Sequence, residues 1–239
     1  MRLDGVEKAF RETRVLRGVT LEVRRGETLV LLGGSGSGKS VLLKHLNGLL
    51  RPDRGAVVVE GQHLEALPEE ALVPVRRQVG MLFQGGALFD SLTVGDNVAF
   101  PLREHRIVPE REIPARVAEA LATVDLRGVE GAMPAELSGG MRKRAALART
   151  LVLQPRVLLY DEPTTGLDPV VAARINHLIR DLQHRLGLTS VVVTHDLQSA
   201  FFVADRIAFL HEGRIRFHGT PAEARASTDP PLHEFLTAA

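Results

Sequence analysis

The chain has 239 residues, of which 44% are hydrophobic, and a formal net charge of +1 at pH 7. This length and composition suffice for a globular core, and the balanced charge provides no global field that would attract nucleic acid or anionic lipid. The chain contains no cysteine, which excludes disulfides, thiolate metal sites and cysteine nucleophiles.

The N-terminal segment MRLDGVEKAF does not join a charged region to an apolar one, so we expect no signal peptide. No apolar stretch approaches the ~18 residues that a transmembrane helix needs. If the protein works at a membrane, another component must hold it there.

The first half of the chain predicts a sheet with two environments. Residues 19–23 (VTLEV) alternate apolar and polar, as in a half-buried strand, whereas residues 28–32 (TLVLL) are uniformly apolar, as in a buried parallel strand. Helical spacing over residues 40–50 is followed by predicted strands at 55–61 and 79–83.

Residues 93–153 show no good strand pattern and predict several helices, with Pro114 and Ser138 as start signals. The strand–helix–strand order then resumes, which predicts an α/β fold with a mostly parallel sheet. The remaining predicted elements are strands at 157–161 and 190–194, a helix at 169–186, a hairpin over 206–219 that turns at Glu212 and Gly213, and a short terminal helix.

The segment GGSGSGKS follows a buried strand and opens a helix, the context that a phosphate-binding loop requires. Its glycines let successive backbone N–H groups point at phosphate oxygens, Lys39 adds a cation, and Ser40 adds a hydroxyl for Mg²⁺. A flexible Gly/Ser turn is the disfavoured alternative. The predicted ATP-binding residues here are Gly33, Gly34, Ser35, Gly36, Ser37, Gly38, Lys39 and Ser40.

In VLLYDEP, Asp161 and Glu162 lie at the carboxyl end of a predicted buried strand, where open parallel sheets bind ligands. We expect Asp161 to hold Mg²⁺ and Glu162 to orient or deprotonate the water that attacks the γ-phosphate. The alternative is that both acids only cap the next helix, because Pro163 and Thr164 follow them.

Two further polar residues end predicted strands at the same edge. His195 follows SVVVT and Gln84 follows VGMLF, so either could reach the nucleotide. Taken alone, His195 is as consistent with a polar strand end, and Gln84 with a turn residue.

The segment ELSGGMRKRAALA predicts a second anion site. Ser138 is a good N-cap, and the two glycines after it leave the N–H groups of a helix start open. The alternative is a well-capped amphipathic helix on which Arg142, Lys143 and Arg144 form a solvated face.

Taken in order, GGSGSGKS, Gln84, LSGG, VLLYDEP, GLDP and His195 resemble the full motif set of ABC-transporter ATPase subunits, over nearly the whole chain. The resemblance implies a single domain with a P-loop NTPase core, an N-terminal antiparallel β subdomain and an inserted helical subdomain. The core would comprise residues 1–88 and 154–239, and the helical subdomain residues 89–153.

In that family two protomers meet head to tail, and the phosphate loop of one and the LSGG helix of the other enclose each ATP. The resemblance therefore implies that Ser138, Gly139 and Gly140 bind the partner's nucleotide and that Asp168 lies at the dimer interface. Phe10 matches the aromatic residue that stacks on adenine, with a core position in an N-terminal hairpin as the alternative.

The resemblance also implies that Gln84 joins Ser40 and Asp161 around Mg²⁺ and that His195 contacts the γ-phosphate. The apolar segment behind Gln84 matches the surface that receives a permease helix. We expect Leu88, Phe89 and their neighbours to form part of that groove, and residues such as Val98 to lie in the core.

A narrower resemblance, to the ATPases of Mla and Mce-associated phospholipid transporters, rests on Met141 after LSGG and on PLREH at 101–105. It implies phospholipid transport with ATP and Mg²⁺, at the cytoplasmic face of the inner membrane. The implied partners are a second copy of the chain, a permease, an MCE-domain protein and a small STAS-domain protein, with no nucleic acid.

Other functions are compatible with parts of the pattern. ABC ATPases that clamp nucleic acid carry long coiled coils or zinc modules, and this sequence predicts neither. An ATPase in assembly or signalling, or a transporter of lipoprotein or another solute, stays an alternative.

Overall fold

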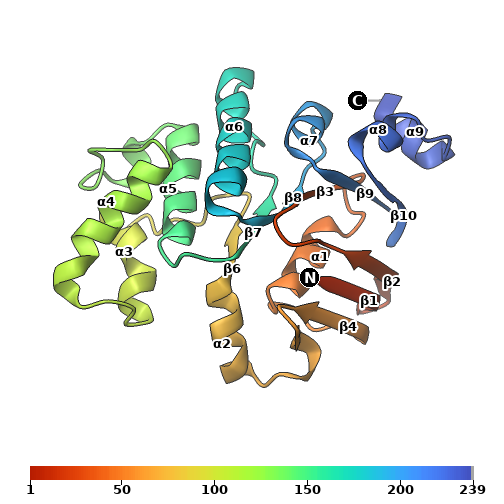
Figure 1. Ribbon diagram of the computed structural model, residues 1–239, viewed down its shortest axis with the longest axis horizontal. Coiled ribbons are helices and arrows are strands. Elements are labelled where there is room, and N and C mark those ends of the chain that lie inside the picture. The colour runs from red at the N-terminus through yellow and green to blue at the C-terminus, as the bar shows by residue number, and fades with distance from the viewer. Residues whose placement is uncertain (238–239) are drawn as a thin grey trace.

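The strands of the computed structural model, which describes residues 1–237, form two sheets (Figure 1). The strands are β1 (Arg2–Phe10), β2 (Thr13–Glu22), β3 (Thr28–Leu32), β4 (Arg54–Val59), β5 (Gln62–His63), β6 (Val79–Leu82), β7 (Val157–Asp161), β8 (Thr189–Val193), β9 (Arg206–His211) and β10 (Arg214–Gly219). The helices are α1 (Lys39–Leu46), α2 (Glu69–Gln78), α3 (Val94–Glu104), α4 (Ile113–Thr123), α5 (Gly139–Leu151), α6 (Pro169–Leu186), α7 (Leu197–Val203), α8 (Pro221–Arg225) and α9 (Pro230–Thr237).

The larger sheet has the order β10-β9-β3-β8-β7-β6, with all pairs parallel except β10 with β9. Every residue of β3, β7 and β8 is buried, as the uniformly apolar run TLVLL predicts. The predicted hairpin is present, and its turn contains Glu212 with a positive φ of 47°. The α/β fold with a mostly parallel sheet is therefore confirmed.

The smaller sheet, β2-β1-β4-β5, is antiparallel. Val19 and Leu21 of β2 are buried while Thr20 and Glu22 are exposed, so the predicted alternation is confirmed. Its apolar face, α1 and one face of the larger sheet enclose one core cluster, to which Leu3, Leu29 and Leu42 belong, for example.

The helices α3, α4 and α5 pack together to one side of both sheets (Figure 1). They share a second core cluster with the other face of the larger sheet, and Val98 is fully buried there, as expected. Both predicted start signals lie in place: Pro114 is in the first turn of α4, and Ser138 caps α5 by accepting a hydrogen bond from the Met141 N–H (3.3 Å).

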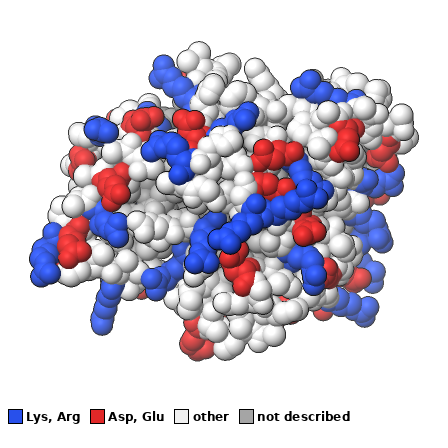
Figure 2. Space-filling model, viewed as in Figure 1, with Lys and Arg blue, Asp and Glu red and all other residues white. Residues whose placement is uncertain are grey.

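Figure 2 shows basic and acidic side chains interspersed over one face of the molecule, in keeping with the balanced formal charge. None of the helices within residues 1–237 combines the length and the apolarity that a bilayer crossing requires.

Candidate functional site

The loop Gly33–Ser40 joins the end of β3 to α1 at the carboxyl edge of the larger sheet. Gly36 and Gly38 have φ values of 75° and 106°, which L-residues with side chains rarely adopt. At Gly33 an added Cβ would lie 2.4 Å from the carbonyl oxygen of Leu210 in β9, so a side chain there would collide with the neighbouring strand.

The middle of this loop, residues 34–36, is exposed, whereas Gly33, Gly38 and Lys39 are buried. The Ser37 N–H donates to the Gly34 carbonyl (3.3 Å), which curls the loop back on itself. The Ser37 hydroxyl is buried and has no hydrogen-bond partner within the described chain. A buried hydroxyl normally has a partner, so this orphaned group fits a loop that is completed by a bound phosphate.

Lys39 points into the curl of the loop. Its ammonium donates to the carbonyl oxygens of Gly33 (2.8 Å) and Gly34 (2.9 Å), and the residue is only 8% exposed. Burial lowers the pKa of Lys39, and the nearby carboxylates of Glu162 and Asp161 partly oppose that shift. The cation is thus held where nucleotide phosphates would need charge compensation.

Ser40 and Asp161 meet across the sheet edge. The Ser40 hydroxyl donates to Oδ1 of Asp161 (2.9 Å), the buried last residue of β7. Hydroxyl and carboxylate oxygens are ligands that Mg²⁺ accepts together with substrate phosphates. Residues 1–237 contain no cluster of three or more His, Cys, Asp or Glu that could hold a metal alone. This donor set fits an Mg²⁺ ion shared with a nucleotide.

Glu162 has an unusual backbone conformation and a fixed carboxylate. Its φ is 50°, and its N–H donates to the Val193 carbonyl at the end of β8 (2.9 Å). The carboxylate lies 2.9 Å from His195 Nδ1 through Oε1, and its Oε2 accepts from the Thr165 hydroxyl (3.0 Å). The structure therefore brings Glu162 and His195 together, and it adds Thr165, which sequence patterns did not indicate.

The alternative that Asp161 and Glu162 only cap the next helix is wrong. Helix α6 begins after these residues, and Asp168 is its N-cap: Oδ1 accepts from the N–H groups of Val170 and Val171, both at 3.0 Å. The two acids at the end of β7 are thus free for another role, while the interface role of Asp168 stays a prediction.

Gln84 follows β6, and its main chain is held by Lys143. The ammonium of Lys143 donates to the Gln84 carbonyl and lies 3.4 Å from the Glu162 carbonyl. Lys143 is only 7% exposed, so the alternative of a solvated Arg142–Arg144 face is wrong for this residue. Gln84 is exposed, and among the described residues its side chain makes no hydrogen bond to Asp161; its role at Mg²⁺ stays a prediction.

The start of α5 is exposed at Ser138 and tightly packed at Gly140. An added Cβ at Gly140 would lie 2.4 Å from Cγ1 of Val171 on α6, while one at Gly139 would lie 3.2 Å from Cδ2 of Leu167. These glycines therefore let α5 approach α6 closely. The predicted role of Ser138, Gly139 and Gly140 toward a partner's nucleotide needs a second chain.

Phe10 lies at the tip of the β1–β2 hairpin and is 43% exposed, so its alternative placement in the core is wrong. The same hairpin touches the phosphate loop, because an added Cβ at Gly38 would lie 3.1 Å from Cγ1 of Val15. An exposed aromatic ring on a strand pair that packs against this loop fits the predicted stacking on a base.

A pair of exposed aromatic residues follows Gln84. The rings of Phe89 and Phe100, 44% and 39% exposed, lie 4.9 Å apart, and the Arg149 guanidinium lies 5.7 Å from the Phe89 ring centroid. Leu88 is partly buried against the core. This exposed apolar surface is where the sequence predicts contact with a permease.

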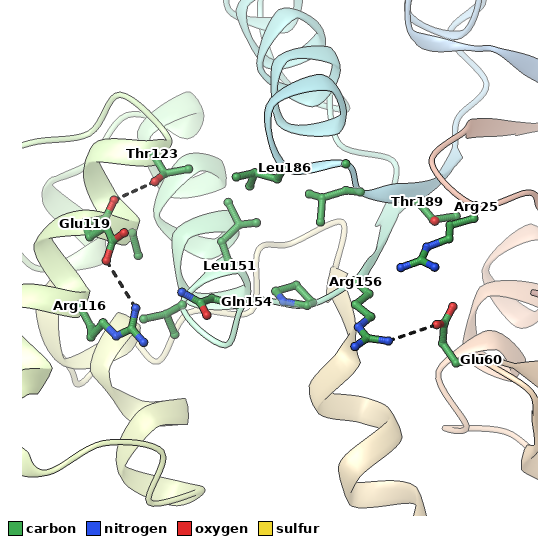
Figure 3. Close-up of a pocket in the computed structure, with 15 residues that line it drawn as sticks. Arg25, Glu60, Arg116, Glu119, Thr123, Leu151, Gln154, Arg156, Leu186 and Thr189 are labelled. Atoms are coloured by element: carbon green, nitrogen blue, oxygen red, sulfur yellow. Dashed lines mark hydrogen bonds and ion pairs between the residues drawn. The ribbon is translucent and has the colours of Figure 1, made fainter.

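A pocket of about 400 Å³ lies away from these residues (Figure 3). It opens between α4 and the starts of β7 and β8, with an Arg156–Glu60 ion pair (3.7 Å) on one side and an Arg116–Glu119 pair (3.6 Å) on the other. Its 15 lining residues do not include the phosphate loop. This pocket therefore lies at the opposite end of the strands from the phosphate loop.

This site has the parts of an ATP-binding cassette. They are a phosphate loop after β3, an acidic pair at the end of β7, and a capped helix, α5, in a helical insertion. Residues 16–165 match the ABC transporter family, and the chain belongs to that family.

Two relatives and one solved structure are similar to this chain over most of its length. The chain is 44% identical over 234 residues to the probable ribonucleotide transport ATP-binding protein mkl of Mycobacterium tuberculosis, covering 98% of this chain and 65% of mkl. It is 41% identical over 218 residues to the intermembrane phospholipid transport system ATP-binding protein MlaF of Escherichia coli, covering 91% of this chain and 81% of MlaF. The dimeric ATP-binding cassette MJ0796 with ADP and Pi superimposes with a TM-score of 0.84 at 32% identity, covering 92% of this chain and 97% of MJ0796. The chain thus spans about two thirds of the mycobacterial relative and most of the other two.

Proposed function

We propose that this chain is the ATP-hydrolysing subunit of an ABC transporter that moves phospholipid between membranes. The observation that carries the ATPase role is the Glu162 carboxylate, held at both oxygens beside the Ser40–Asp161 pair. The similarity to MlaF, whose name assigns it to intermembrane phospholipid transport, supports phospholipid as the cargo. The name of mkl, a probable ribonucleotide transport protein, supports a different solute as the second candidate.

The loop N–H groups and Lys39 bind the phosphates of ATP, and Phe10 stacks on adenine. Ser40, Asp161 and Gln84 would hold Mg²⁺, which would supply positive charge to offset that of the phosphates. Glu162 orients the attacking water and accepts its proton, and His195 contacts the γ-phosphate. The products are ADP and phosphate.

Two chains complete each site in this proposal. The core (residues 1–88 and 154–239) of one chain supplies the phosphate loop, and the helical subdomain (89–153) of the other supplies Ser138, Gly139 and Gly140, with Asp168 at the interface. The dimer of MJ0796 with ADP and Pi supports this arrangement. ATP then closes the dimer, and hydrolysis reopens it.

The exposed pair Phe89–Phe100 receives a cytoplasmic helix of a permease, which holds the chain at the cytoplasmic face of the inner membrane. An MCE-domain protein and a small STAS-domain protein complete the assembly. Support for these two partners comes from the similarity to MlaF and from the Met141 and PLREH segments.

The test is to express this chain with a tag together with its neighbouring genes, purify it in detergent and identify proteins and lipids by mass spectrometry. A permease, an MCE-domain protein and bound phospholipid are the expected result. A permease with a different cargo would overturn the lipid assignment. Absence of any membrane partner would favour the assembly or signalling alternative.

A further inference from the structure

Lys143 is a buried lysine whose ammonium lies where two neighbouring strands end. Leu82 of β6 pairs with Tyr160 of β7, and the chain then diverges toward Gln84 on one side and Glu162 on the other. The Lys143 ammonium donates to the Gln84 carbonyl and lies 3.4 Å from the Glu162 carbonyl. It therefore bridges the two strand ends just beyond the last backbone pair.

A buried cation is costly unless it is paired, so its retention at this position needs a reason. Burial lowers the pKa of Lys143, and the carboxylates of Asp161 and Glu162 oppose that shift. The ammonium is thus held by main-chain carbonyls of the proposed hydrolytic centre, although Lys143 belongs to helix α5 of the helical block, which we define as residues 89–153.

We define residues 84–89 as the lid segment. The last turn of helix α5 also contacts this segment. Arg149 donates to the carbonyls of Ala87 (2.7 Å) and Gly86 (3.4 Å), and its guanidinium lies 5.7 Å from the Phe89 ring centroid. The 13-residue helix α5 therefore binds the lid segment at two places, through hydrogen bonds from Lys143 and from Arg149.

We infer that Lys143 is a positioning residue that couples the lid segment and helix α5 to the catalytic Glu162 of the same chain. The Glu162 N–H donates to the Val193 carbonyl, and the Glu162 carbonyl faces the Lys143 ammonium. The backbone of Glu162 is thus held on both sides of its Cα, so a shift of α5 changes the direction of the carboxylate. The inference rests on the proposed role of Glu162. It adds a route by which displacement of the lid, or of Ser138 at the start of α5, reaches the attacking water.

The experiment compares Lys143→Met with the matched control Arg144→Met in the full chain. Arg144 is next in sequence, but its guanidinium donates to the Asp125 carbonyl within the helical block, away from Glu162. Steady-state ATPase activity is measured over a range of ATP concentrations, at several protein concentrations. We expect Lys143→Met to lower kcat at least about tenfold, with KM for ATP within about twofold, and Arg144→Met to keep both values within about twofold.

Lys143→Gln provides the second variant, because its amide can still donate to one carbonyl without a buried charge. We expect it to recover part of the lost kcat. Normal kcat in folded Lys143→Met, or equal losses in both Met variants, would overturn the inference. If Lys143→Met does not fold, as judged by thermal melting, unchanged kcat in Lys143→Gln would overturn it instead. Failure of the proposed function is distinguishable, because it would show as normal hydrolysis by Glu162→Gln.

Discussion

At the scale of single residues, the proposed chemistry depends on one carboxylate in an uncommon conformation. Glu162→Gln keeps the size and the backbone but removes the proton acceptor, and general-base catalysis contributes about 10²–10⁴ in rate. We therefore expect kcat to fall at least about 100-fold while ATP binding, which depends on the phosphate loop, stays within a few-fold. Steady-state ATPase assays and fluorescence titration with ATP measure the two quantities.

The control for this substitution is Glu212→Gln. Glu212 also has a left-handed φ, 47° against 50° for Glu162, but it lies in the exposed β9–β10 turn. The Glu212→Gln variant should hydrolyse ATP at the rate of the unsubstituted chain. Rapid hydrolysis by Glu162→Gln would show that another group activates the water.

The phosphate loop contains a second single-residue constraint, at Gly33. An added Cβ would lie 2.4 Å from the Leu210 carbonyl oxygen, a backbone atom that cannot rotate away. Forced overpacking of this kind costs about 1–3 kcal/mol, which corresponds to about 2–4 °C of melting temperature per kcal/mol in a chain of this size. We expect Gly33→Ala to lower the melting temperature accordingly, measured without nucleotide.

Gly34→Ala is the matched control, because an added Cβ there meets nothing within 4 Å. Its melting temperature should stay within about 1 °C of the original. Equal melting temperatures for the two variants would contradict the close approach of the loop to β9.

At the scale of elements, helix α5 joins a structural role to a proposed binding role at one residue. Asp, Asn and Ser cap helices about equally well, so Ser138→Asp and Ser138→Asn should both preserve the folded helix. Only Asp adds a negative charge where we propose that the partner's ATP lies. We expect Ser138→Asp to lower ATPase activity at least about tenfold and Ser138→Asn to lower it less, with melting temperatures unchanged.

A melting temperature that falls in parallel with activity would assign Ser138 to capping alone. Equal activity of the Asp and Asn variants would place the partner's nucleotide away from α5.

Elements and residues whose character is local were predictable from the sequence. The phosphate loop, the buried strands around it and the Ser138 cap follow from short-range patterns. Helix α2 was not predictable in this way, because Pro74 lies inside it and argues against a helix. Helix α7 was not predictable either, because seven residues are too few for a periodic signal. The burial and contacts of Lys143 were not predictable for another reason. Lys143 lies in a run of charged residues, and its hydrogen-bond partner Gln84 is 59 positions away in the sequence.

At the scale of the whole molecule, the proposed site is divided between parts that one chain does not bring together. The phosphate loop, Asp161 and Glu162 lie at the carboxyl edge of the larger sheet, whereas Ser138 begins a helix of the helical block (Figure 1). A second chain in the arrangement of a cassette dimer would supply the missing part. The dimer should then depend on bound ATP and break when the γ-phosphate is lost.

This dependence makes the oligomeric state a direct test. Glu162→Gln is expected to bind ATP and to cleave it only slowly. We therefore expect this variant to sediment as a monomer with ADP and as a dimer with ATP and Mg²⁺, in analytical ultracentrifugation at equal protein concentration. The control is Lys39→Ala combined with Glu162→Gln, which lacks the cation in the loop and should stay monomeric with either nucleotide. A dimer that forms equally with ADP, or in the double variant, would mean that the interface does not contain the nucleotide. The proposed sharing of each site between two chains would then be wrong.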